Sequence, residues 1–415
     1  MTNYRSLRGM PDMLPDDAEL FRAVEEKARK VFDIFEFREI RTPIMEDNDV
    51  FTRSIGAETD IVEKEMYTFS DRGGKQISLR PEATASIVRA FIEHGMHGDN
   101  EVCKLFYVGP MFRAERPQKG RLRQFHQIGA EIIGSKSITC DAELIVNVKA
   151  VLDSLGINDP VISVNSLGCP SDRETYKKVL GDFLASNMGA LCENCVKRST
   201  RNVLRVLDCK SEKCKETLKG APVISDHLCG GCLGEFNELK KLLMASGVVF
   251  NEKHDLVRGL DYYTGTVFEL SHPSLGAQDA IAAGGRYDKL SKEMGGPDVG
   301  ATGYAIGVER VLLILKDRYT VKKEPGVLVI CLDEKTRERA FTVVNRLREN
   351  GIRADMDHSA RSLKGGLRKA NRENRKKVVI IGEDELARGT LLVKDMASGE
   401  QKSVVLDALV GEFKQ

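Results

Sequence analysis

A short, strongly basic segment between two apolar stretches constrains the fold of this 415-residue chain more than any other feature. Residues 111–127 read MFRAERPQKGRLRQFHQ and hold five arginines and lysines within eleven positions. Pro117 and Gly120 favour a turn in the middle of the segment, and the residues on both sides suit strands. The pattern predicts an antiparallel hairpin, with strands at 101–109 and 125–134 and a basic tip between them.

Two chemical interpretations of this basic tip are open from the residues alone. A run of charges on an edge hairpin is commonly just a solvated surface. Guanidinium groups, however, are planar and permanently charged, so they bind phosphate oxygens through paired hydrogen bonds. Other donors and acceptors, which solubility does not require, alternate with the cations: Glu115, Gln118, Gln124, His126 and Gln127. The sharper hypothesis is a hairpin that binds phosphates and recognises a polar ligand.

Two distant segments complete a family resemblance. Residues 256–265 read LVRGLDYYTG and residues 303–310 read GYAIGVER. The basic hairpin resembles motif 2 of the class II aminoacyl-tRNA synthetases, in the form found in histidyl-tRNA synthetases. The second segment resembles the histidyl signature and the third resembles motif 3. The resemblance runs from residues 8–12 to the C-terminal domain. It implies an α+β fold, with a class II antiparallel-sheet catalytic core, a helical insertion and a C-terminal α/β anticodon-binding domain.

The length and periodicity of the chain indicate two domains, because 415 residues exceed what a single core normally holds. We expect a catalytic core at 1–320 and an α/β domain at 325–415, with a polar linker at 317–326. A charged, cysteine-containing helical insertion is expected at about 170–250. The remaining core elements are expected as helices at 17–35 and 139–155, strands at 161–165, 266–271 and 278–282, a glycine turn at 282–288 and a strand-to-helix unit at 303–315.

The C-terminal region alternates between strand and helix patterns, which predicts a largely parallel sheet. The expected strands are 327–331, 353–356, 377–381, 390–395 and 402–406, with helices at 334–350 and 363–374 and a short final helix. A basic run follows residue 360, and Gly365-Gly366 suits a loop that enters a helix whose N-terminus can accept phosphate. Its cations are Arg361, Lys364, Arg368, Lys369, Arg372, Arg375, Lys376 and Lys377.

The helix at 17–35 is followed by a strand pattern at 37–43 that ends at Pro43. This resembles motif 1, and the resemblance implies a homodimer interface; a plain buried helix with an edge strand would give the same pattern. Glu36 departs from the resemblance, because many family members carry glycine there, so the local turn is uncertain.

Composition sets wider bounds on location and partners. The formal net charge is +1, so RNA binding must depend on local patches. No segment has the pattern of a signal peptide or the length of a membrane span, and the ten cysteines are diluted in a long chain. We therefore expect a cytoplasmic protein with reduced thiols.

The resemblance implies an enzyme that ligates L-histidine to tRNA(His) through a histidyl-adenylate, using ATP with Mg²⁺ and forming AMP and diphosphate. It assigns catalytic roles to Arg113 and Arg258, both near the α-phosphate. ATP binding is assigned to Arg113, Glu115, Arg121, Phe125 and Arg310. The tRNA contacts at the hairpin tip are assigned to Arg116 and Gln118. Any one of these arginines alone would be read as a surface ion pair.

Selecting histidine requires groups that pair with the imidazole nitrogens, because unpaired polar groups in such a site penalise other amino acids. The resemblance places Glu131 and Tyr263 at the ring, and Glu82 and Thr84 at the α-amino group. Tyrosines are also common core residues, which weakens the assignment of Tyr287 most. The full expected histidine site is Glu82, Ala83, Thr84, Arg113, Gln127, Glu131, Arg258, Tyr262, Tyr263 and Tyr287.

Six cysteines of the insertion leave a metal site open. Cys192-x2-Cys195 and Cys229-x2-Cys232 lie about 33 residues apart and could together form a Cys₄ zinc site. Cys209 and Cys214 exceed the needs of one such site, and the resemblance carries no zinc requirement. Packed thiols are the other interpretation, so no metal ligand is assigned.

Two other functions compete with the synthetase. A regulatory subunit of the first enzyme of histidine biosynthesis shares the core but lacks the anticodon-binding domain and has degraded histidine signatures. An RNA-binding module with a zinc-stabilised insertion would need neither the histidine pocket nor motif 3. The retention of Arg258, both neighbouring tyrosines and the C-terminal domain argues against both.

Overall fold

The computed structural model describes residues 4–56, 59–98, 102–316, 318, 325–358 and 362–414. By internal contacts the chain divides into two compact units, residues 1–320 and 321–415. Most of the expected linker, and Arg361 of the basic run, lie outside the described residues. None of the helices that the structure describes is long and apolar enough to cross a membrane.

An eight-stranded sheet forms the centre of the first unit, and all of its neighbouring strands are antiparallel except the two pairs at its edges. Its strands, in spatial order, are β1 (Arg38–Glu39), β5 (Cys103–Phe112), β6 (Gln124–Ile133), β11 (Ala301–Gly307), β10 (Ala280–Arg286), β9 (Thr266–Ser271), β7 (Val161–Ser166) and β8 (Asn251–Glu252). The predicted hairpin is the β5–β6 pair, and the antiparallel core agrees with the expected fold class.

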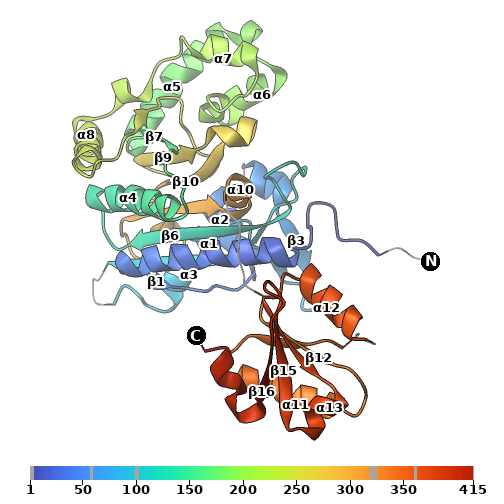
Figure 1. Ribbon diagram of the computed structural model, residues 1–415. Coiled ribbons are helices and arrows are strands. Elements are labelled where there is room, and N and C mark those ends of the chain that lie inside the picture. Colours follow the sequence, from blue (N-terminus) through green and yellow to red (C-terminus); the bar gives the residue numbers. More distant parts are fainter. Residues whose placement is uncertain are drawn as a thin grey trace. The chain divides into compact units, whose positions relative to one another are not determined.

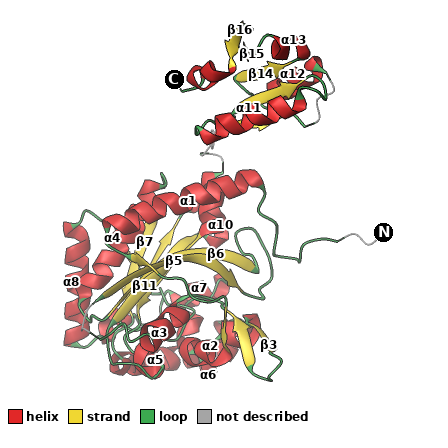
Figure 2. Ribbon diagram, turned by 90° about the horizontal axis from the view of Figure 1, so that it is seen from below, coloured by secondary structure: helices red, strands yellow, loops and turns green. Residues whose placement is uncertain are grey.

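Three helices pack together along one face of this sheet (Figures 1 and 2): α1 (Pro15–Ile34), α4 (Ile138–Ser154) and α10 (Val308–Leu315). The α1 sequence has apolar residues at helical spacing, and Leu20, Val24, Ala28 and Val31 are accordingly buried. Phe32 at the end of the same stripe stacks on Phe106 of β5 with ring centroids 4.5 Å apart. These helices leave the opposite sheet face available for a ligand.

Smaller elements cover the hairpin end of the sheet. A three-stranded sheet in the order β2 (Met45–Asp47), β4 (Gln76–Leu79) and β3 (Tyr67–Ser70) is accompanied by α2 (Asn48–Ile55), the π-helix η1 (Ile61–Glu65) and α3 (Thr84–Glu93). The short helices η5 (Pro273–Gln278) and α9 (Leu290–Glu293) flank β10.

The insertion is helical, as predicted, and projects beyond β7 and β9 in Figure 1. It consists of α5 (Pro170–Ser186), η2 (Met188–Ala190), α6 (Glu193–Arg201), η3 (Val203–Val206), α7 (Glu212–Leu218), η4 (Ile224–His227) and α8 (Gly230–Ala245). Its buried side chains, such as Tyr176, Leu204 and Cys214, belong to the same hydrophobic core as Tyr262 and Tyr263. The insertion therefore packs continuously with the part of the core that carries the histidyl signature.

The second unit contains one five-stranded sheet, ordered β13 (Ala354–Met356), β12 (Val327–Cys331), β14 (Lys377–Ile381), β15 (Thr390–Asp395) and β16 (Gln401–Val405). Its helices are α11 (Arg337–Glu349), α12 (Leu363–Arg372), α13 (Glu383–Ala387) and the 3-10 segment η6 (Leu406–Glu412). The first two strand pairs are parallel and the last two are antiparallel. The prediction of a largely parallel sheet was wrong, because β15 and β16 follow β14 through short connections that only antiparallel pairing allows.

Three local predictions also need correction. Gly284 and Gly285 lie inside β10, not in a turn. A Cβ at Gly284 would collide with the backbone oxygen of Gly303, and one at Gly285 with that of Thr266, so the strand requires glycine at both positions. The strand expected at 37–43 pairs only at Arg38 and Glu39. Gly365 and Gly366 lie in the first turn of α12, after Ser362, whose hydroxyl accepts the Gly365 N–H at 3.2 Å.

Candidate active site

Strand register brings the polar residues of the hairpin onto one sheet face. Along β6, Gln127 and Glu131 point to the same side because side chains alternate in a strand. Glu131 lies opposite Leu105 of β5 and Gly303 of β11. Gly303 has no side chain, and a Cβ there would overlap the Glu131 carboxylate. The glycine in motif 3 thus makes room for the acidic side chain of the neighbouring strand.

A pocket of about 260 Å³ opens on this face. Most of the residues that the resemblance assigns to histidine and ATP line it: Glu82, Thr84, Arg113, Glu115, Arg121, Phe125, Gln127, Arg258, Tyr262, Tyr263 and Arg310. They come from segments up to 228 positions apart in the chain, from Glu82 to Arg310, so the fold brings together the three sequence motifs.

The carboxylate of Glu82 holds the start of α3 at one end of the pocket. It accepts the backbone N–H groups of Thr84 at 2.7 Å and Ala85 at 2.9 Å. Burial raises the pKa of Glu82, although these N–H donors and Arg113 favour its charged form. Ala83 is buried behind the lining and contributes packing there. A carboxylate beside a pocket suits an incoming ammonium group.

Glu131 lies beneath the pocket lining and is 1% exposed. The Thr84 hydroxyl donates to its Oε1 at 2.8 Å, and the Tyr287 hydroxyl donates to its Oε2. Burial raises the pKa of Glu131 to about 8, against the opposing effect of these two hydroxyl donors. Tyr287 is itself fully buried, so it acts on the pocket through Glu131 and through its edge contact with Tyr262.

Tyr262 and Tyr263 form an aromatic wall, with ring centroids 4.7 Å apart. Burial raises the pKa of Tyr263 to about 12, so its hydroxyl keeps its proton at neutral pH and can donate a hydrogen bond. Gln127 lies on β6, and its Oε1 atom is buried and has no hydrogen-bond partner among the described residues. An orphaned buried acceptor at a pocket is satisfied when a ligand donor arrives.

Arg113 follows directly after β5, and its Nε donates to the Pro81 carbonyl at 2.9 Å. Its guanidinium carbon lies 5.3 Å from the centre of the Phe125 ring. Burial lowers the pKa of Arg113 from its ordinary value. The cation is therefore poorly solvated, and a phosphate or carboxylate that contacts it replaces missing water.

Arg258 and Arg310 reach the same pocket from two other elements. Arg258, in the loop before β9, donates from Nη1 to Glu269 Oε2 at 2.7 Å, while its Nε is buried without a partner among the residues described. Arg310, in the first turn of α10, donates to the carbonyls of Gly120 and Ala280. Burial, and then the neighbouring charge of Arg121, lowers the pKa of Arg310. Such a concentration of cations favours an oligophosphate ligand.

The hairpin tip separates into inward and outward residues. Arg121 forms an ion pair with the buried Glu115, and both line the pocket. Arg116 and Gln118 are exposed and do not line it. Their position leaves them available to a larger partner that approaches the pocket from outside.

Sequence reasoning missed three residues of the site. Tyr107 of β5 and Glu309 of α10 line the pocket, and Glu269 of β9 holds Arg258. Glu309 also accepts the backbone N–H of His126 at 2.9 Å. Tyr107 and Gly109 lie on the same face of β5, and Gly109 pairs with Gln127 of the site. The alternation of side chains along the strand could therefore have indicated Tyr107. The Arg258–Glu269 pair depends on a loop conformation that no sequence signal announces.

The cysteines of the insertion do not combine as the sequence suggested. Cys192 and Cys195 lie with Cys209 and Cys214, whereas Cys229 and Cys232 lie with Cys169 and Asp172. The two CxxC pairs therefore belong to different groups. The interpretation that both pairs form one Cys₄ site was wrong. All ten cysteines lie in the described part of the chain as free thiols.

An antiparallel sheet with a basic β5–β6 hairpin, and an arginine at the following strand-to-helix junction, defines a class II aminoacyl-tRNA synthetase. The family model described as "Histidyl-tRNA synthetase" matches residues 9–311, and that described as "Anticodon binding domain" matches residues 326–415. The chain belongs to the histidyl-tRNA synthetase family.

Individual relatives agree over nearly the whole chain. A histidine–tRNA ligase of Thermodesulfovibrio yellowstonii is 47% identical over 408 residues, covering 98% of this chain and 97% of the relative. One of Geobacter sulfurreducens is 45% identical over 400 residues, covering 96% and 97%. The crystal structure of apo histidyl-tRNA synthetase from S. aureus superimposes with a TM-score of 0.82 at 34% identity and covers all of both chains.

Proposed function

We propose that the pocket activates L-histidine with MgATP and transfers the histidyl group to tRNA(His), and that the residues gathered in it perform this reaction. Membership of the histidyl-tRNA synthetase family supports the ligase activity. The observation that carries the assignment of the site is the convergence of Arg113, Arg258 and Arg310 on a pocket that Glu82 and Thr84 also line. That arrangement offers cations to phosphates and acceptors to an amino acid.

In the first step, a carboxylate oxygen of histidine attacks the α-phosphorus of ATP. The bond between this phosphorus and the oxygen bridging to the β-phosphate breaks, and diphosphate leaves. Negative charge builds up on the oxygens around the α-phosphorus, so positioned cations stabilise the transition state. We assign Arg113 and Arg258 to the α-phosphate and Arg310 to the γ-phosphate. Phe125 stacks on the adenine and Glu115 holds it, and Arg121 makes a further contact with ATP.

The ion pairs within the pocket fit this assignment. Arg258 is held by Glu269 and Arg121 by Glu115, so each cation has a partner that fixes its position before a phosphate arrives. Pre-positioning of this kind reduces the reorganisation needed at the moment of reaction.

Histidine is recognised by other residues of the same pocket. We assign Glu82 and Thr84 to the α-amino group, with Ala83 forming the backbone beside them, and Gln127 to a bridging contact. Glu131 and Tyr263 pair with the imidazole nitrogens, and Tyr262 and Tyr287 shape the wall around the ring. In the second step, a ribose hydroxyl at the 3′ end of the tRNA attacks the acyl carbon, and AMP leaves.

The tRNA extends beyond the pocket. We assign the exposed Arg116 and Gln118 to contacts with the tRNA near its reactive end. In the second unit, Lys364, Arg368 and Arg372 lie four residues apart on α12 and are exposed, so they form one cationic stripe. We assign residues 325–415 to anticodon recognition. A homodimer built through the motif 1 region and a cytoplasmic location stay predictions, the first testable by the mass of the purified protein in solution.

Histidine-dependent exchange of labelled diphosphate into ATP tests the proposal directly. Exchange that requires histidine and is not supported by other amino acids is the expected result. A regulatory relative or a simple RNA-binding protein would show none, and its absence from the folded full-length chain would overturn the proposal.

A further inference from the structure

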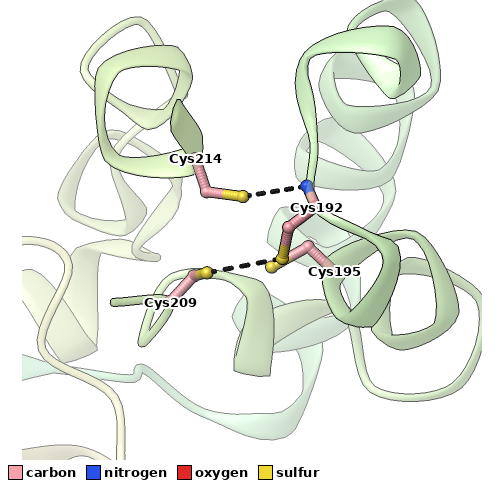
Figure 3. A group of neighbouring side chains, drawn as sticks. All are labelled: Cys192, Cys195, Cys209 and Cys214. Carbon is pink, nitrogen blue, oxygen red and sulfur yellow. Dashed lines mark hydrogen bonds between the residues drawn. The ribbon is translucent and has the colours of Figure 1, made fainter. Parts of the chain in front are cut away.

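Four cysteines of the insertion converge on one point, outside the pocket described above. Cys192 immediately precedes α6 and Cys195 lies in its first turn, Cys209 follows η3, and Cys214 lies on α7. Their sulfur atoms all lie within 4.8 Å of one another. Figure 3 shows the four side chains pointing toward a common centre from three separate segments. Cys195 and Cys214 are fully buried.

The spacing of the sulfurs matches a tetrahedral metal thiolate. Zinc–sulfur bonds of about 2.3 Å at tetrahedral angles place neighbouring sulfurs about 3.8 Å apart. Cys192 Sγ and Cys209 Sγ are separated by 3.8 Å. A disulfide would need about 2.05 Å, so the thiols are arranged around a shared centre and not joined in pairs.

The surroundings of the sulfurs also suit thiolate ligands. The backbone N–H of Cys192 points at Cys214 Sγ, with 3.1 Å between nitrogen and sulfur. Backbone N–H donors of this kind stabilise the charge of metal-bound thiolates. The C-x2-C pair at the start of α6 supplies two ligands from one helical turn, an arrangement that recurs in structural zinc sites.

We propose that Cys192, Cys195, Cys209 and Cys214 form a structural zinc site in the insertion. Four thiolates complete the coordination shell, so the ion has no open position for chemistry. The second group, Cys169 with Asp172, Cys229 and Cys232, does not support an equal claim. Asp172 already caps α5 by accepting the Cys169 N–H at 3.2 Å, and Cys229 is exposed.

The four-cysteine site holds a segment of the insertion that contacts the loop carrying Arg258. The segment between Cys195 and Cys209 carries Asn202 and Arg205. Arg205 Nη2 donates to the Gly259 carbonyl at 2.5 Å, and Asn202 Nδ2 donates to Asp261 Oδ1 at 3.3 Å. Gly259 and Asp261 flank Leu260 in the loop directly after Arg258. Zinc therefore fixes α6 and η3, which position the loop that carries Arg258; this second effect rests on the proposed function of Arg258.

The metal content of the full-length protein tests the site without reference to activity. Protein purified with reductant and without chelator is analysed by elemental mass spectrometry. The Cys192→Ser/Cys209→Ser double variant should contain one zinc per chain fewer than the wild type, whether or not the second group contributes an ion. Cys331→Ala, a buried cysteine of the second unit, is the matched control and should contain as much zinc as the wild type.

Two further measurements cover a variant that fails to fold. Cys209→His keeps a zinc ligand and should restore the lost equivalent, whereas Cys209→Ser should not. Cobalt(II) added to the chelator-treated wild type should give the intense thiolate absorption bands of a tetrahedral Cys₄ site. A wild type without zinc and without these bands, or a double variant with unchanged zinc, would overturn the proposal.

Activity then tests the link to the catalytic loop. Protein stripped of zinc by a chelator, then returned to chelator-free buffer with Mg²⁺, should show histidine-dependent exchange at least tenfold lower, and added zinc should restore it. If zinc is lost and exchange does not change, the metal site stands, but the proposed effect of zinc on the loop that carries Arg258 is wrong. Absence of exchange in the zinc-loaded wild type would instead refute the proposed function, so the two failures are distinguishable.

Discussion

Glu131 lies in an environment very different from that of a solvated side chain. Its carboxyl is buried, and its pKa is raised to about 8 from 4.5. Between these two values the folded chain holds one proton more than the unfolded chain at this site, so stability falls as the pH rises. Below about pH 4.5 Glu131 is protonated in both the folded and the unfolded chain, so no stability is lost. Above about pH 8 the loss is complete.

Glu131→Gln should remove this dependence, because the amide keeps the size of the side chain and does not titrate. The unfolding free energy of the variant relative to the wild type should therefore rise between pH 5 and pH 8, at roughly 1.4 kcal/mol per pH unit. Denaturant unfolding of both proteins at several pH values measures it. A difference independent of pH would show that the Glu131 pKa is not raised.

The same substitution should weaken histidine use more than ATP use. Loss of the carboxyl partner of the imidazole should cost about 1–3 kcal/mol, or roughly fivefold or more in the KM for histidine. The KM for ATP, measured in the same exchange assay, serves as the internal control. Equal changes in both would reassign ring recognition, with Tyr263 as the next candidate.

Arg258→His should lower histidine-dependent exchange by two to three orders of magnitude while the fold survives. Removing one positioned donor from a developing oxyanion typically costs about 3–4 kcal/mol. Arg22→His on the exposed side of α1 is the matched control and should keep wild-type exchange. A folded Arg258→His protein with near-normal exchange would remove this residue from the mechanism.

At the scale of elements, the end of α1 contains a backbone strain. Glu36 has φ 59°, in the left-handed region, and its side chain is exposed. A non-glycine residue pays roughly 1–2 kcal/mol there, while glycine loses about 0.5–1 kcal/mol in additional chain entropy. Glu36→Gly should therefore raise the unfolding free energy by about 0.5–1 kcal/mol. Lys30→Gly, an exposed position inside α1, should lower it by a similar amount. A loss of stability in Glu36→Gly would mean that its side chain makes a contact worth more than the strain.

Elements with a strong periodic pattern were predictable from the sequence. The strands β9, β12 and β14 begin and end at the expected residues, and α1, α4 and the β5–β6 hairpin lie within a few residues of their predicted bounds. Gly284 and Gly285 were misread because a glycine pair looks the same in a turn and in a strand that packs closely against its neighbours. The antiparallel direction of β15 and β16 could have been predicted, because the connections between the strands expected at 377–381, 390–395 and 402–406 are too short for parallel pairing.

The candidate site was predictable as far as its motifs extend. Residues inside the three motifs line one pocket, because strand register and the start of α10 bring those segments together. Tyr107 and Glu269 lie outside the quoted motifs, and Glu309 lies inside motif 3 but was not assigned to the site. The grouping of the cysteines was beyond the sequence, because which thiols meet depends on how α5, α6, α7 and α8 pack.

At the scale of the whole molecule, the pocket belongs to the first unit alone. The lining residues of the pocket all belong to residues 1–320, as do the helices that cover the central sheet. The second unit has its own buried core, in which Val329, Val343 and Ile381 are completely buried. Each unit therefore has the packing needed to fold without the other.

A chain truncated after residue 320 should accordingly retain histidine-dependent exchange near the wild-type rate. Charging of tRNA should fall sharply, through a higher KM for tRNA, because residues 325–415 are assigned to anticodon recognition. In the full-length chain, replacing Lys364, Arg368 and Arg372 by alanine should raise the same KM and reduce its dependence on salt, since each lost phosphate contact removes part of the counterion release. Replacing Arg337, Arg346 and Arg348 of α11 by alanine removes the same charge elsewhere in the unit and is the control. Circular dichroism and the mass in solution must first show that the truncated chain is folded and has the oligomeric state of the wild type. Equal tRNA charging by that chain and the full-length protein would show that the second unit has another function.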